Sequence, residues 1–448
     1  MNIENDDNQL EFISSGTDPV GKVFQYQSKI YRQINSEYKN SILEFLHSDL
    51  YSVLLQKKFI LPATIATDLP FKKDSLILEH PKLPCPVQPY EWTFHMLQDA
   101  CITLLNLFLI CREHGYTLKD GHPWNISFYY THPVFLDFGS FKKRTEQDEE
   151  SFQQEFISSF YFPLKMWSQN EFYFAHRMLS DDYYPRFDFY NQPFQKYNRY
   201  LWKEYCVYAA KHHLNALAEK TIKKRIFHDE YSLPSLLKKI RKMKINSTSF
   251  WKHYHDGILN DQSTVSRYTS LLELLKKYDI DSMIDLAGNQ GAFSLFALQH
   301  SKIHSSICTD YDEGALDVLY CSTRTENNPI HITPVLMNVL FPIHASNPTE
   351  QPKTADVAVA LALTHHLILT QKHSIDLIFS RIGAYTRKYV LIEFMPLGLW
   401  DGLHPVPPLP EWYTRNWFRT NFQNHFDLLE EQEICTNRIA FLGKIKQT

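Results

Sequence analysis

Acidic and glycine residues gather where an apolar segment gives way to a helical pattern. The segment Ser282–Ser294 predicts a strand that ends in Asp285, a loop that carries Gly288 and Gly291, and a helix that starts near Ala292. Glycine lets the backbone approach a ligand closely, and ligands of open parallel sheets bind where strands end. The sequence therefore predicts a ligand site at this junction.

A second carboxylate follows the next predicted strand. This strand ends in Cys308-Thr-Asp310, and Asp310 lies 25 residues after Asp285. An acid at this distance is placed to accept hydrogen bonds from both hydroxyl groups of a ribose. We therefore expect a nucleoside-containing cofactor.

Groups that can move protons follow two later strands. His365 and His366 come after an apolar strand, and Glu393 lies near the end of the next one. Histidine titrates near neutrality, so either imidazole could serve as a base. Each residue also has a structural alternative, in which it packs, orients a loop or hydrogen-bonds at a strand end.

Helices alternate with short apolar strands from about residue 265 to the C-terminus. This alternation predicts βαβ units and a parallel, Rossmann-like sheet. The predicted strands cover residues 282–286, 305–310, 332–337, 356–362 and 388–394.

The N-terminal half shows a different pattern, which is typical of an α+β domain. Residues 20–34 predict a two-stranded hairpin, and a third strand at 75–79 stops at a proline-rich connector. A helix is expected over 90–114, followed by short strands at 126–130 and 133–136. Residues 145–245 are predicted to be mostly helical and end in a basic amphipathic helix.

Composition limits the function classes. The 448 residues carry a net charge of −4, which offers no global attraction to nucleic acid or anionic lipid. The seven cysteines include no C-x-x-C pair, so we expect reduced thiols. The apolar run Cys101–Cys111 is too short to span a bilayer, so no membrane contact is expected. Together these features predict a cytoplasmic protein.

Residues 260–448 resemble the class I S-adenosylmethionine-dependent methyltransferases. The segment Asp285-Leu-Ala-Gly-Asn-Gln-Gly291 resembles the family's first motif, and three later segments resemble the following motifs in order. The resemblance implies that S-adenosylmethionine is the cofactor. It also implies a role in binding this cofactor for Asp285, Ala287, Gly288, Gly291, Asp310, Tyr311 and Asn338. Ala287 and Asn289 stand where the family often has glycine.

The segment from Leu118 to Gly139 resembles the catalytic loop and metal-binding segment of protein-kinase-like folds. The resemblance implies that Asp120 would be the base and that Asn125 and Asp137 would hold the magnesium of Mg-ATP. The rest of the kinase set is incomplete. Its phosphate-covering loop would use Gly16 and Gly21, Lys29 or Arg32 would replace the usual lysine, and Glu37 or Glu44 would be its partner.

Nearly the whole chain resembles bacterial nodulation host-specificity methyltransferase-like proteins, which share His80-Pro, Pro89-Tyr-Glu-Trp and Leu118-Lys-Asp in similar form. We therefore expect a kinase-like domain at 1–245, active or not, and a methyltransferase domain at 246–448. The expected acceptor is a small or glycan-derived molecule. Two alternatives stay open: a bifunctional methyltransferase and ATP-dependent phosphotransferase, and a binding module without catalysis.

Overall fold

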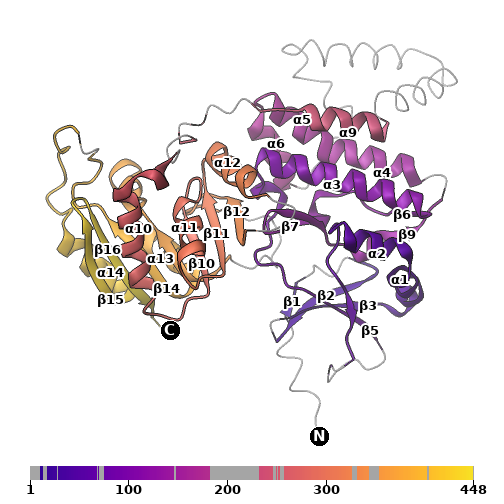
Figure 1. Ribbon diagram of the computed structural model, residues 1–448, viewed down its shortest axis with the longest axis horizontal. Helices are drawn as coiled ribbons and strands as arrows, with labels where there is room; N and C mark the ends of the chain where they lie inside the picture. The colour runs from indigo at the N-terminus through magenta and orange to yellow at the C-terminus, as the bar shows by residue number, and fades with distance from the viewer. Residues whose placement is uncertain are drawn as a thin grey trace, which may run out of the picture.

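The computed structural model describes most of both halves of the chain (Figure 1). The predicted loop residue Gly16 and residues 182–231 of the predicted helical segment 145–245 lie outside the described residues. The described ranges are 11–13, 18–27, 29–67, 69, 75–145, 148–181, 232–245, 249, 251–252, 257–324, 330–342, 353–400 and 403–446.

An antiparallel sheet of five strands opens the N-terminal half, in the order β1-β2-β3-β5-β4. The predicted hairpin is confirmed, because β2 and β3 pair along their full length. The predicted third strand is also confirmed, and it pairs with β3. The bounds are β1 (Glu11–Phe12), β2 (Gly21–Tyr26), β3 (Lys29–Ile34), α1 (Lys39–Leu46), α2 (Asp49–Gln56), β4 (Thr64–Ile65) and β5 (Leu76–His80).

Helix α3 (Phe94–Glu113) is the central helix of this half. By length and composition it could cross a membrane, but 67% of its most apolar window is buried inside the protein, as in the core helix of a globular domain. Two short antiparallel strand pairs, β6 with β9 and β7 with β8, lie beside it. The bounds are β6 (Tyr116–Leu118), β7 (Ile126–Tyr129), β8 (His132–Phe135), β9 (Phe141–Lys143), α4 (Asp148–Phe156), α5 (Phe162–Ser168), α6 (Phe172–Asp181) and α9 (Leu233–Lys242).

The C-terminal half is an open sheet of seven strands in the order β12-β11-β10-β13-β14-β16-β15. The first five strands are parallel, which confirms the predicted Rossmann-like sheet, whereas β16 pairs antiparallel with β14 and β15. The predicted strands all form. Their bounds are β10 (Ser282–Leu286), β11 (Ser305–Asp310), β12 (Ile332–Leu336), β13 (Ala355–Ala360) and β14 (Thr386–Phe394).

Helices connect β10 to β11, β11 to β12, β13 to β14 and β14 to β15, and the antiparallel pair β15–β16 completes the edge of the sheet (Figure 1). This edge pair was not predicted, because β15 alternates irregularly between exposed and half-buried residues. The remaining bounds are α10 (Gln262–Leu275), α11 (Ala292–His300), α12 (Glu313–Thr323), α13 (Ile375–Ala384), α14 (Arg415–His425), β15 (Phe426–Cys435) and β16 (Arg438–Ile445).

The two halves share one hydrophobic core, which includes buried residues from both. Helix α12 packs beside α3 (Figure 1), and two of its acids accept hydrogen bonds from the first backbone N–H groups of α3. Phe94 N–H donates to Glu313 Oε1 at 3.1 Å, and His95 N–H donates to Asp317 Oδ1 at 3.0 Å. Because helix N-termini favour negative charge, α12 caps α3 across the boundary between the halves.

The Pro89-Tyr-Glu-Trp segment is part of the same joint. The carboxylate of Glu91 forms an ion pair with Lys353 at 2.6 Å, and the two side chains are only 5% and 7% exposed. Trp92 is fully buried and packs edge-on against Phe128. These residues therefore link the N-terminal half to the chain that leads into β13.

Candidate functional site

The loop after β10 has the backbone that the first motif requires. Ala287 and Asn289 have φ angles of +57° and +55°, in the left-handed region where glycine is favoured. A Cβ on Gly288 would lie 2.7 Å from Cys308 Sγ and 2.8 Å from the Asp285 carboxyl carbon. The loop therefore keeps the glycine-like conformation although two positions are not glycine.

Asp285 lies at the floor of this loop and is 2% exposed. Its Oδ2 accepts a hydrogen bond from Ser294 Oγ at 2.8 Å. Burial raises the pKa of Asp285 to about 7, and the nearby charge of Asp310 acts in the same direction. A cationic group of a ligand would stabilise the ionised form.

Asp310 ends β11 and is 9% exposed. Its carboxylate accepts hydrogen bonds from the backbone N–H groups of Asn289 and Asp312, both at 2.7 Å. Burial raises the pKa of Asp310 to about 6, despite these hydrogen bonds. The next residue, Tyr311, is 77% exposed and lines the same cavity.

Asn338 follows β12 and also lines the cavity. Its Oδ1 accepts hydrogen bonds from the backbone N–H groups of Leu340 and Phe341, at 3.0 and 3.1 Å. Because a carbonyl oxygen has two lone pairs, both already engaged here, the amide nitrogen is the better group to face a ligand.

Glu393 is fully buried and pairs with two arginines. Arg267 donates to both of its oxygens, and Arg438 donates to Oε2 at 2.9 Å. Although burial opposes ionisation, the two guanidinium groups lower the pKa of Glu393. Its Oε2 also accepts the backbone N–H of Ala362 at 3.1 Å. This arrangement suits a residue that positions the loop after β13 better than it suits a base.

His365 and His366 follow that loop, at the start of a π-helix (His366–Thr370), and their ring centroids are 4.2 Å apart. His365 is 5% exposed, and burial lowers its pKa to about 3. Burial also lowers the pKa of His366, which is the more accessible of the two. Both imidazoles are therefore neutral near pH 7, and both line the cavity.

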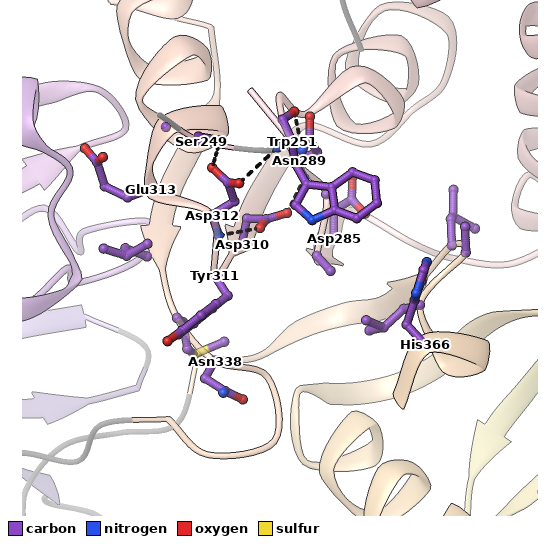
Figure 2. A pocket seen from close by; sticks show the side chains of 18 of the residues that line it. Ser249, Trp251, Asp285, Asn289, Asp310, Tyr311, Asp312, Glu313, Asn338 and His366 are labelled. Carbon is purple, nitrogen blue, oxygen red and sulfur yellow. Dashed lines mark hydrogen bonds between the residues drawn. The ribbon is translucent and has the colours of Figure 1, made fainter. Parts of the chain in front are cut away.

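A short segment before α10 crosses the site and was missed in the sequence. Figure 2 shows the indole ring of Trp251 between the Asp310 side of the pocket and His366. The backbone carbonyl oxygen of Trp251 accepts a hydrogen bond from Asn289 Nδ2 at 3.2 Å, and its backbone N–H donates to Asp312 Oδ2 at 3.3 Å. Ser249 Oγ also donates to Asp312. No sequence motif indicates this contact, because it depends on the tertiary structure that brings Ser249 and Trp251 next to the loops after β10 and β11.

These groups surround one cavity of about 1630 Å³. Its walls come from both halves of the chain. The C-terminal half contributes the predicted cofactor residues and both histidines, and the N-terminal half contributes residues of α6 and of the Pro89–Trp92 segment. A ligand in this cavity would therefore touch both halves.

The interface with α3 holds a second cluster that the sequence did not reveal. His95 Nδ1 lies 2.6 Å from Asp317 Oδ2, and the ligand atoms of His95, Asp317 and Cys321 lie within 4.8 Å of one another. Such a set could hold a metal ion by its ligand types. In this structure the histidine and the aspartate form a hydrogen-bonded pair.

In the N-terminal half, one of the predicted residues, Asp137, contacts a buried arginine. Arg32 donates to Asp137 Oδ1 at 3.3 Å and to Asp18 Oδ2 at 3.2 Å. Burial raises the pKa of Asp137, and Asp120 lies close enough to add to this effect. The Asn125 carbonyl oxygen accepts the N–H of Leu136 at 2.8 Å, which places Asn125 next to this group.

The prediction that Glu37 or Glu44 would be the partner of Lys29 or Arg32 was wrong. Among the described residues, Arg32 pairs with Asp18 and Asp137 and not with Glu37 or Glu44. Glu44 pairs with Lys143 at 3.0 Å. Lys29 pairs with Glu79 at 2.8 Å on the neighbouring strand, because alternate residues of β3 face opposite sides of the sheet.

No protein-family model matches this chain. It is 24% identical over 418 residues to "Nodulation protein NoeA" of Rhizobium meliloti (strain 1021), an alignment that covers 85% of this chain and 83% of that protein. A relationship over nearly the whole chain, as predicted, is therefore confirmed.

Solved methyltransferase structures are similar to part of the chain. An S-adenosylmethionine-dependent methyltransferase from Clostridium acetobutylicum is 11% identical, with a TM-score of 0.32, and the match covers 44% of this chain and 97% of that one. The methyltransferase domain of bacterial CtHen1 is 13% identical, with a TM-score of 0.32, and the match covers 42% and 100%. The strand order of the sheet, and not these likenesses, carries the argument for the fold.

Proposed function

We propose that the C-terminal half is an S-adenosylmethionine-dependent methyltransferase. The observation that carries the proposal is the junction after β10 and β11, where a glycine-like loop and two buried carboxylates face one cavity. The hydrogen bonds described for these two carboxylates come from the Ser294 hydroxyl and from backbone N–H groups, and none of them comes from a cationic side chain. Buried acids of this kind fit a ligand that supplies hydroxyl groups and a positive charge.

The residues present fit this cofactor. Asp310 would accept hydrogen bonds from ribose hydroxyl groups, and Asp285 would face the ammonium group of the amino-acid end. Tyr311 and Asn338 would lie beside the base. When bound, the cofactor supplies a methyl group attached to a sulfonium sulfur.

The chain's own part in the reaction is to hold and deprotonate an acceptor. An acceptor O–H or N–H would give its proton to a neutral imidazole, while its oxygen or nitrogen forms the bond to the methyl group. The methyl–sulfur bond would break in the same displacement, and its electron pair would return to sulfur, so that S-adenosylhomocysteine leaves as a neutral thioether. His366 suits this role better than His365, because an imidazole with a pKa of about 3 is a poor proton acceptor. Glu393 would position the loop that leads to both histidines.

Calorimetry with S-adenosylhomocysteine tests the cofactor site. We expect binding by the wild-type chain and at least a 100-fold loss in Asp310→Ala, since about 1.5–3 kcal/mol accompanies each hydrogen bond to a charged group. Asp279→Ala is the matched control, because Asp279 is an acid of the same half whose side chain is fully exposed. Absence of binding, or equal binding by Asp310→Ala, would refute the proposal.

We also propose that the N-terminal half is a kinase-like scaffold that does not transfer phosphate. An antiparallel sheet, a proline-rich connector, a long helix and the Asp137-Phe-Gly139 segment follow one another in the expected order. Arg32 already binds the carboxylate of Asp137, which a magnesium ion would need. The guanidinium group of Arg32 at the predicted magnesium ligand Asp137 supports a scaffold that does not carry out metal-dependent phosphate transfer.

A thermal shift with Mg-ATP separates this proposal from the bifunctional alternative. We expect no stabilisation of the wild-type chain by Mg-ATP. A stabilisation that is lost in Asp137→Ala would favour the bifunctional protein. Methyl incorporation into small molecules of the source cell that is lost in the double variant of His365→Ala and His366→Ala would exclude a binding module without catalysis.

A further inference from the structure

Helix α6 has two different faces. Ala175, Met178 and Leu179 are buried against the core of the N-terminal half. The other face lines the shared cavity with residues at the spacing that one side of a helix requires. These residues are Phe172, Tyr173, His176, Arg177 and Ser180.

The cavity face carries two aromatic side chains that are unusually open. Phe172 is 56% exposed and Tyr173 is 68% exposed. Exposed large apolar side chains that gather in a concave site are typical of ligand-binding surfaces. Flat aromatic rings contact the faces of other rings over a large area.

His176 lies on the same face, and its ring packs against Trp167 with the two ring centroids 4.3 Å apart. Its Nδ1 lies 3.2 Å from the carbonyl oxygen of Tyr90, so Nδ1 carries the proton and donates it. Burial lowers the pKa of His176 to about 4, so the ring is neutral. Its Nε2 is buried and has no hydrogen-bond partner among the described residues. A ligand that donates a hydrogen bond would satisfy this nitrogen.

The cavity is large enough for two molecules. Pockets for one small ligand usually measure about 300–1,000 Å³, whereas this cavity measures about 1630 Å³. The predicted cofactor residues Asp285 and Asp310 occupy one wall, and His366 and the α6 face belong to others. Space remains beside the cofactor site, and α6 borders it.

We propose that α6 is the acceptor-binding wall and that the acceptor is a small ring compound with hydroxyl groups. Its ring would pack against Phe172 and Tyr173, and one hydroxyl would donate to His176 Nε2. This inference rests on the proposed methyltransferase function. It gives the N-terminal half a role in substrate recognition, which needs no phosphate transfer. Sugars and phenols share this chemistry.

The test is ligand retention from the low-molecular-mass extract of the source cell. The full chain, saturated with S-adenosylhomocysteine, is mixed with the extract, separated by gel filtration and examined by mass spectrometry for bound compounds. We expect retention of a hydroxylated ring compound, and ultraviolet absorption and periodate sensitivity distinguish a phenol from a sugar. Retention should fall at least tenfold in Tyr173→Leu and in His176→Phe.

Phe174→Leu is the matched control. Phe174 lies on the same helix and is 39% exposed, but it is not among the described residues that line the cavity. We expect wild-type retention in this variant and wild-type S-adenosylhomocysteine affinity in all three. Retention of no ring compound by the wild-type chain, or equal retention by Tyr173→Leu and His176→Phe, overturns the inference. Failure of the wild-type chain to bind S-adenosylhomocysteine instead refutes the proposed function, and retention is then measured on the unsaturated chain.

Discussion

Replacing Asp285 by asparagine is expected to stabilise the free protein and to weaken its cofactor site. The pKa of this buried carboxyl group is raised from 3.8 to about 7, so folding opposes its ionisation. At about 1.4 kcal/mol per pKa unit, the difference corresponds to about 4 kcal/mol above pH 7. Asparagine has the same shape and can still accept the hydrogen bond from Ser294.

The sign of the pH dependence follows from the raised pKa. The cost of ionising Asp285 is absent below the unfolded pKa of 3.8, grows as the pH rises, and is complete above about 7. We therefore expect Asp285→Asn to gain about 4 kcal/mol at pH 8.5 and only about 2 kcal/mol at pH 5. Taking roughly 2 °C per kcal/mol, the melting temperature should rise by roughly 8 °C at pH 8.5.

The same variant should bind S-adenosylhomocysteine about 10- to 100-fold more weakly by calorimetry at pH 8.5, because a charged partner of an ammonium group is lost. Gain of stability with loss of binding is the expected signature of a ligand site that stores a buried charge. Equal melting temperatures at pH 8.5, or unchanged affinity, would refute the reasoning.

Asp356→Asn is the control with the opposite sign. Asp356 is a buried acid of the same sheet, and its Oδ1 accepts a hydrogen bond from Arg387 at 3.1 Å. Although burial opposes ionisation, the hydrogen bonds and the positive charge lower the pKa of Asp356. This carboxylate adds stability above its unfolded pKa, so Asp356→Asn should melt at a lower temperature than the wild-type chain at pH 8.5.

Three further predictions concern the joint and the loop. Although burial opposes it, the hydrogen bond to Asp317 helps raise the pKa of His95 to about 10. The stability from this pair is therefore present below pH 6.5 and is lost as the pH rises through 10. Thermal melts of His95→Gln should lack this decline. Lys353→Met leaves Glu91 buried without its ion-pair partner and should lower the free energy of unfolding by about 3–5 kcal/mol in urea titrations, whereas Lys353→Arg should keep most of it. Gly288→Ala places a methyl group 2.7 Å from a cysteine sulfur and should cost about 1–3 kcal/mol of stability and weaken S-adenosylhomocysteine binding in calorimetry.

The α/β alternation of the C-terminal half was readable from the sequence because its parallel strands are buried on both faces. Continuous apolar runs such as residues 357–360 mark such strands, and the acids at the ends of parallel strands must lie at one edge of the sheet. The positions of Asp285 and Asp310 follow from this local pattern and from the topology rule. The strand pair β15–β16 was missed, because an edge pair with mixed exposure carries no clear period.

The pairing of charges could not be read in the same way. Glu393 has the sequence position of a base, but Arg267 and Arg438 reach it from elements far along the chain in either direction. Arg32 of β3 likewise pairs with Asp18 and Asp137 and not with the predicted glutamates. Such contacts depend on which elements meet, and no periodicity records that.

Local sequence thus decided most of the secondary structure, the five parallel strands of the C-terminal half and the carboxylates at their ends. These features depend on residue type, burial period and backbone conformation over a few neighbouring positions. Tertiary structure alone decided that Trp251 crosses the pocket and that one face of α6 lines the same cavity as Asp310. The physical reason is that side chains far apart in the chain meet only when the two halves pack around a shared core, and this packing also sets the burial that shifts their pKa values.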